Sequence, residues 1–259
     1  MSGMSGAVAL NTFREAVRDR VLYNLILFAL LMIGAAVLVG QISIGIERLV
    51  IINLGLSAIS VFGLVMAIFI GVGLVYKEIE KRTLYSLLAR PVRRWEFLVG
   101  KYVGLLLTLV VNILLMSVGL AAALFAVGRP LLRSDLSILT AIYFIVLELA
   151  LVIAVAIFFS CFSTPMLSAL FTLAIYIAGV FAWEIRDFGA LVHSPAVHLA
   201  VRVVYYTLPN FHNFNIIAAV GHAERVPFSL IWQNTLYALL YVTLLLLASA
   251  TVFSRSNLK

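Results

Sequence analysis

Long stretches without charged residues are the feature of this sequence that most limits how the chain can fold. They cover residues 21–40, 49–76, 102–128, 136–161 (interrupted only by Glu148), 167–183 and 226–254. An apolar helix of about 20 residues crosses the hydrocarbon core of a bilayer. Five of the six runs reach that length, and the run at 167–183, with 17 residues, lies at the short limit. The sequence therefore predicts an all-α, polytopic membrane protein with six transmembrane helices, built as one domain over residues 1–259.

Composition excludes a soluble protein. Hydrophobic residues make up 64% of the chain and charged residues 11%, whereas soluble domains average about 45–50% and about 25%. A net charge of +7 would indicate a nucleic-acid partner in a soluble protein, but in a membrane protein Lys and Arg mainly set orientation. We therefore expect membrane lipids around the chain and no nucleic acid.

The distribution of positive charge predicts the orientation. With both termini in the cytoplasm, twelve of the eighteen Lys and Arg residues fall on the inner side, seven of them in the loop 77–101. Cytoplasmic loops of membrane proteins carry such an excess. We expect a multi-pass protein of the cell inner (plasma) membrane with both termini inside, a cytoplasmic loop at 77–101 and an extracytoplasmic segment at 184–225.

Residues 10–20 predict an amphipathic interfacial helix before the first span. Leu10, Phe13 and Val17 recur at helical spacing, and charged residues fall elsewhere around the helix. Thr12 and Glu15 have the spacing of a capping box at its start. Two alternatives stay open: a charged flank with the same orienting effect, or a helix that packs on a partner protein.

The central loop carries a short apolar face. Leu84, Leu87 and Leu88 are spaced at i, i+3 and i+4, and Pro91 ends that helix before the next begins. A leucine patch held between two spans needs a surface that buries it. Either a cytoplasmic protein or the lipid surface would serve.

This loop resembles that of the type-2 ATP-binding cassette (ABC) transporter permeases of the exporter class. The family pattern has an acidic-basic cluster, T-L-x-x-L-L-x-x-P, an Arg, a Glu-Phe pair and G-K at the start of the third span. It is matched here by Glu78, Glu80, Thr83, Leu84, Leu87, Leu88, Pro91, Arg94, Glu96, Phe97, Gly100 and Lys101. Arg82 replaces the usual glycine. The F-R-E-x-x-R segment near the N-terminus, the six-span layout and the long outside segment extend the resemblance over nearly the whole chain, which is most similar to the group with the nitrous-oxide-reductase maturation permease.

The resemblance implies a coupling helix at about 83–89 that docks on a separate ATP-binding cassette ATPase subunit. The partner-binding residues would be Glu78, Thr83, Leu84, Leu87, Leu88, Pro91 and Arg94. It also implies a second permease copy, as a homodimer or a paralogous heterodimer, with ATP and Mg²⁺ bound in the ATPase and no cofactor in this chain. Gly100-Lys101 lacks the flanking residues of a phosphate-binding loop, which places ATP hydrolysis in the partner.

The resemblance therefore implies a permease subunit that couples ATP hydrolysis to translocation of a substrate, most simply export. The alternative is an ATPase-coupled membrane scaffold that regulates or matures a partner protein and moves no substrate. The sequence has no H-E-x-x-H or G-x-S-x-G motif and no paired acids. We therefore expect no catalytic residues and no enzyme activity in this chain.

Glu148 lies near the middle of the fourth run. A charge at that depth costs about 2.5–3.5 kcal/mol on insertion scales, so its side chain must face the bundle or water. One interpretation is a substrate- or proton-sensitive site. The other is a neutral acid hydrogen-bonded to a neighbour such as Asn112 or Asn53. Glu148 and Asn112 are our intramembrane polar candidates.

All four histidines, His193, His198, His212 and His222, lie in the segment 184–225. Their spacings fit none of the compact metal-ligand motifs. Packing among interfacial aromatic residues explains them better, so we predict no metal site. Within this segment, residues 196–208 are apolar enough for a helix that dips into the outer leaflet, similar to the re-entrant helices of the permease family.

Overall fold

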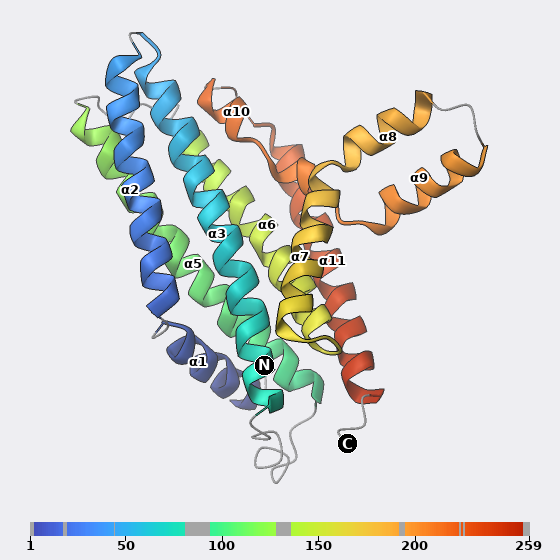
Figure 1. Ribbon diagram of the computed structural model, residues 1–259. Coiled ribbons are helices and arrows are strands. Elements are labelled where there is room, and N and C mark those ends of the chain that lie inside the picture. Colours follow the sequence, from blue (N-terminus) through green and yellow to red (C-terminus); the bar gives the residue numbers. More distant parts are fainter. Residues whose placement is uncertain are drawn as a thin grey trace.

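Five long helices run side by side in the computed structural model of the chain (Figure 1). They are α2 (Arg20–Ile42), α3 (Glu47–Glu80), α5 (Arg94–Ala126), α6 (Leu136–Ser160) and α11 (Phe228–Arg255). Each contains a stretch that is long and apolar enough to cross a membrane. The structure describes residues 3–17, 20–43, 45–80, 94–127, 136–191, 195–222, 224 and 226–255, and among these it has helices and no strand.

Two helices extend beyond the predicted spans. The third predicted span begins at residue 102, but α5 begins eight residues earlier at Arg94, and α3 continues past residue 76 to Glu80. Charged residues stop a hydrophobic run without stopping a helix, because Lys, Arg and Glu have good helix propensity. The predicted loop at 77–101 is therefore helical at both of its ends.

The fifth predicted span, 167–183, corresponds to a shorter helix, α7 (Pro165–Val180), with 16 residues. Pro165 stands in its first turn, where a missing N–H costs nothing. The helix ends at Val180, before the predicted end at Trp183, and the chain turns at Phe181 into α8 (Ala182–Leu191). At 1.5 Å per residue, α7 is about 24 Å long and α6 about 38 Å. The shorter helix leaves part of α6 to be covered by another segment.

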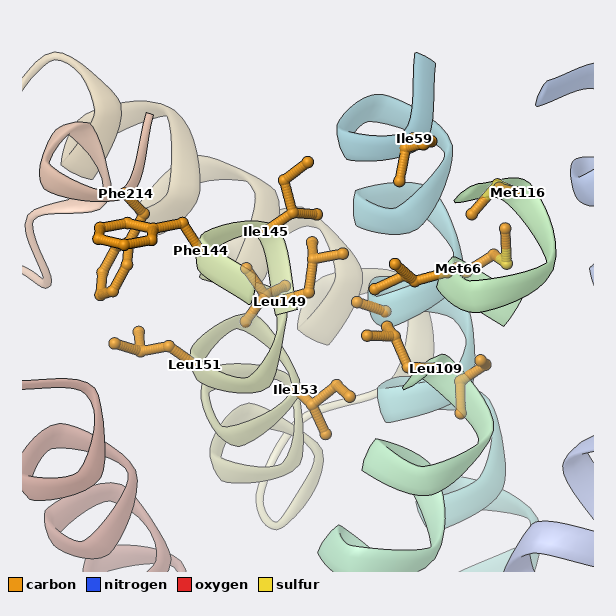
Figure 2. Close-up of a cluster of buried hydrophobic side chains, with 14 of the residues drawn as sticks. Ile59, Met66, Leu109, Met116, Phe144, Ile145, Leu149, Leu151, Ile153 and Phe214 are labelled. Carbon is orange, nitrogen blue, oxygen red and sulfur yellow. The ribbon is translucent and has the colours of Figure 1, made fainter. Parts of the chain in front are cut away.

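Helix α6 lies at the centre of the bundle. Every side chain from Glu148 to Ile157 is buried, with α3, α5, α7 and α11 packed around the helix. On α3, Gly63 lies against Leu149 and Gly71 against Ala156, so the small residues of α3 bring the two helices close. Figure 2 shows Leu149 and Ile153 in this core, with Ile59 and Met66 of α3 nearby.

Helix α1 (Gly3–Val17) packs on the first half of α5. A methyl group at Gly100 would lie 2.7 Å from the Ser5 carbonyl oxygen, and one at Gly104 would lie 2.5 Å from that of Ala9. The two glycines form a G-x-x-x-G pair, which permits such close approach. The buried face of α1 carries small residues, whereas Leu10 of the predicted apolar face is 49% exposed.

The predicted start of this first helix was wrong. The helix begins at Gly3, and Thr12 is a buried mid-helix residue against Gly104 rather than a cap. A hydrophobic pattern does not detect a contact made by Ser, Ala and Gly, and this explains the error.

The predicted outside segment 184–225 is largely helical. It contains α8, α9 (Pro195–Thr207), the 3-10 helix η2 (Phe211–Phe214) and α10 (Ile217–Gly221). Helices α8 and α9 form a hairpin that leans away from the bundle (Figure 1). The guanidinium of Arg186 lies 5.3 Å from the ring centres of both Trp183 and Tyr205, which joins the two helices by cation–π contacts.

Candidate functional site

A hydrogen bond joins Glu148, at the middle of α6, to α7. The hydroxyl of Tyr176 donates to Oε1 of Glu148 at 3.0 Å. Glu148 is 5% exposed, so its side chain faces the bundle, as an acid in a membrane helix must. The partner is a tyrosine from the shortened helix, not one of the two asparagines that the sequence suggested.

Those two asparagines lie elsewhere. Asn112 is buried on α5, and its Nδ2 atom has no hydrogen-bond partner. The Oδ1 atom of Asn53, on α3, is also buried and unpartnered, and the Asn53 side chain lies against Gly221 of α10. Neither asparagine lines the cavity beside Glu148. Of the two predicted intramembrane polar candidates, Glu148 lines the cavity and Asn112 does not.

The segment around η2 covers the part of α6 that α7 leaves free. Phe211 and Phe214 are each 1% exposed. Phe214 lies beside Phe144 of α6, with ring centres 6.5 Å apart (Figure 2). Gly179, near the end of α7, has no side chain, and this lets the carbonyl of Pro209 and the ring of Phe211 approach the helix. The end of α7 and the η2 segment thus pack closely against each other.

Helix α11 holds this segment from the other side. The backbone N–H of Asn210 donates to the Tyr237 hydroxyl at 2.8 Å, and Nδ2 of Asn234 donates to the Asn213 carbonyl at 3.2 Å. The Tyr241 hydroxyl lies 3.2–3.4 Å from the carbonyl oxygens of residues 206–208, where α9 ends. These side chains satisfy backbone groups that the non-helical chain exposes.

A cavity lies between these elements, beside the Glu148–Tyr176 pair. It has about 420 Å³ of empty volume, including the part that is open to the surroundings. Its lining residues come from α3, α6, α7 and the η2 region: Ser60, Ile145, Glu148, Tyr176, Val180, Phe211, His212, Phe214, Asn215 and Ile217. His212 and Asn215 are the exposed members, so the cavity opens beside η2 and has Glu148 at its buried side.

The ring of His212, at the mouth, stacks on Trp183 of α8 with 6.4 Å between ring centres. This histidine therefore packs among aromatic side chains. Among the described residues, no group of three His, Cys, Asp or Glu side chains is placed to hold a metal ion.

Two of the predicted partner-binding residues, Glu78 and Arg94, lie at the other end of the bundle (Figure 1). Glu78 is in the last turn of α3, and Arg94 is the first residue of α5. The remaining ones, Thr83, Leu84, Leu87, Leu88 and Pro91, fall outside the described residues. Neither Glu78 nor Arg94 lines the cavity.

Sequence reasoning did not find the cavity residues other than Glu148. Tyr176 offered a signal, because a tyrosine seven positions before the end of the charge-free run 167–183 puts a hydroxyl inside a predicted span. Phe211 and Phe214 offered none, since their burial depends on how far η2 enters the bundle. The cavity combines one acid, hydroxyl and amide groups and several rings, which suits binding of a small ligand rather than covalent chemistry.

Comparison with known proteins relates the chain to a family of transporters. A family model described as ABC-2 family transporter protein matches residues 6–258, nearly the whole chain. A search of curated proteins found no match.

Proposed function

Because the chain belongs to the ABC-2 transporter family and is a membrane permease component of an ABC transporter, we propose that it couples ATP hydrolysis in a separate subunit to export of a substrate. The family match over residues 6–258 is the observation that carries this proposal. The ATPase subunit supplies the ATP and Mg²⁺ sites, and this chain holds no cofactor. Two permease copies form a dimer that encloses the substrate pathway.

The proposed topology has six spans, with α7 as the fifth, and both termini in the cytoplasm of a plasma-membrane protein. The N-terminal helix α1 and the end of α11 lie at the same end of the bundle (Figure 1), as an even number of spans requires. Helix α7, at about 24 Å, is shorter than a hydrocarbon core of about 30 Å. The η2 segment, which packs against its end, supplies the remaining cover.

The proposed contact with the ATPase is the coupling helix at about 83–89. It lies in the 13-residue segment 81–93, between the end of α3 and the start of α5. Both helices are long, with 34 and 33 residues, and both pack on α6. A pull on the segment between them would tilt two rigid helices together, which is how closure of an ATPase dimer can open a permease.

The test is co-expression of the full chain with an ATP-binding cassette subunit. Leu84→Asp and Leu88→Asp put a charge on the leucine face and should prevent its burial. Asn11→Asp, on the exposed face of α1 at the same end of the bundle, is the charge control. We expect the unaltered permease and Asn11→Asp to co-purify with the ATPase and to stimulate ATP hydrolysis, and the two leucine variants to insert normally without stimulating it.

Three results decide the outcome. Wild-type yield and ATPase stimulation with both leucine variants would overturn the proposed docking site. If the unaltered chain forms no complex with an ATPase, the proposal that it works with a separate ATPase subunit is overturned. Stimulated hydrolysis without movement of any substrate into inverted vesicles would favour a membrane scaffold instead.

A further inference from the structure

We propose that the cavity beside Glu148 binds a compact organic cation, of the quaternary ammonium or protonated amine class, with Glu148 as its counter-ion. The inference rests on the proposed transport function and adds the substrate class. Three observations carry it: the charge of the lining, the aromatic walls and the position of the mouth.

The lining has one acid and no strong base. Among the described residues around the cavity, Glu148 is the only carboxyl group, and none is Lys or Arg. Its Oε1 atom accepts the Tyr176 hydroxyl, a neutral donor, at 3.0 Å. A buried carboxylate without a cationic side chain as partner is poorly compensated. A bound cation would supply the missing charge, whereas an anion would be repelled.

The walls are aromatic. Tyr176 and Phe211 have ring centres 5.0 Å apart at an angle of 49°, and Phe214 also lines the cavity. The face of an aromatic ring carries negative partial charge and attracts cations, and sites for quaternary ammonium groups use several such rings. Rings without an acid would accept any apolar ligand. The combination of rings and one carboxylate favours an organic cation over a neutral lipid.

The site is reachable from one side. His212 and Asn215 are exposed at the mouth, while Glu148 is 5% exposed. A ligand that enters beside η2 would pass polar groups first and meet the carboxylate last. In the proposed topology this mouth is on the extracytoplasmic side, so the structure corresponds to a state from which an exported cation leaves.

Binding of radiolabelled choline to the purified full-length chain tests the proposal. The competitor is its neutral carbon isostere, in which a tert-butyl group replaces trimethylammonium. Glu148→Gln keeps the size of the side chain and removes its charge. Glu184→Gln removes an exposed acid from α8 and is the matched control. Tyr176→Phe keeps the ring and releases the carboxylate from its hydrogen bond.

We expect saturable choline binding that Glu148→Gln weakens by roughly tenfold or more, the scale of one desolvated cation–carboxylate contact. Glu184→Gln should bind as the unaltered chain, and Tyr176→Phe should bind at least as well. A purely structural Glu148–Tyr176 pair predicts the opposite order, because a glutamine oxygen still accepts the Tyr176 hydroxyl whereas phenylalanine removes the donor. Gel filtration of each variant verifies that it is folded.

The proposal is overturned if the unaltered chain shows no saturable binding up to millimolar choline, if Glu148→Gln binds equally, or if the neutral isostere competes equally. Any of these results, with ATPase stimulation intact, overturns the ligand class and leaves the proposed function standing. If the chain binds choline as expected but forms no complex with an ATPase, the ligand class stands and the proposed function is overturned.

Discussion

The hydroxyl of Tyr176 donates a 3.0 Å hydrogen bond to the carboxyl group of Glu148. This bond connects α6, the most buried of the five membrane-length helices, to the shorter apolar helix α7. The two residues are 28 positions apart. Helix α7 ends four residues after Tyr176, and η2 packs beside that end and completes the cavity. The Glu148–Tyr176 hydrogen bond thus lies where the long helices of the bundle meet the short segment around η2.

Tyr176→Phe should destabilise the protein by about 1 kcal/mol, within the range of interhelical hydrogen bonds in membrane proteins. The reason is that Oε1 of Glu148 loses its donor in a buried site. Thermal unfolding in detergent measures the effect. Tyr23→Phe, on the exposed side of α2, is the control and should melt as the unaltered protein. Equal melting temperatures for both variants would contradict a stabilising role.

Gly104→Ala should displace α1 from α5. The new methyl group would lie 2.5 Å from the Ala9 carbonyl oxygen, and overpacking of this kind costs about 1–3 kcal/mol. Hydrogen exchange over residues 3–17 should become faster. Gly34→Ala, whose methyl group meets nothing within 4 Å, should be neutral or stabilising by up to about 1 kcal/mol, since glycine is a poor helix former. Slow exchange in Gly104→Ala would exclude the proposed packing.

Gly179→Ala should push η2 away from α7, because its methyl group would overlap the Pro209 carbonyl and the Phe211 ring. We expect a loss of about 1–3 kcal/mol from overpacking and faster hydrogen exchange at 209–216. The matched substitution is Gly73→Ala on α3, which has open space around it. If the two variants behave alike, η2 does not depend on the glycine.

Tyr241→Phe should loosen the end of α9, since its hydroxyl lies against the carbonyls of residues 206–208. The cost is about 1 kcal/mol for a lost hydrogen bond. The expected readout is faster exchange at 206–216. Tyr143→Phe is the comparison, because the Tyr143 hydroxyl bonds Thr235 and does not contact that segment. Hydrogen exchange at 206–216 should stay unchanged in Tyr143→Phe. Faster exchange there in both variants would show that the loss of the Tyr241 contacts is not the cause.

Cysteine labelling tests the orientation. Cys161, the single cysteine, is buried, and Cys161→Ala provides a background without thiols. In that background we expect a membrane-impermeant maleimide to label His198→Cys on α9 in intact cells. Asn11→Cys on α1 should react only after the membrane is opened. Both original side chains are exposed, so the reverse pattern would place the N-terminus outside.

Hydrophobic runs predicted the long helices because each side chain contributes its own free energy of transfer into lipid, so a run can be read without knowing its neighbours in space. They missed the contact of α1 with α5, since Ser5, Ala9 and Gly104 are recognised by small size rather than by hydrophobicity. The burial of Glu148 followed from the cost of a charge in lipid. Its partner Tyr176 did not, because a pair of side chains on two helices depends on how α6 and α7 pack, which a hydrophobic run does not specify.

The glycine contact of α1 has a consequence for how the chain is made. Its docking site, at Gly100 and Gly104, is about 90 residues further along the chain. At about 5–20 residues per second, the ribosome completes α1 roughly 5–20 s before that site exists. During this interval the helix has only the membrane surface or a chaperone to cover it. Its small, weakly apolar face suits this wait, because a strongly hydrophobic helix held so long without its partner would be prone to aggregate.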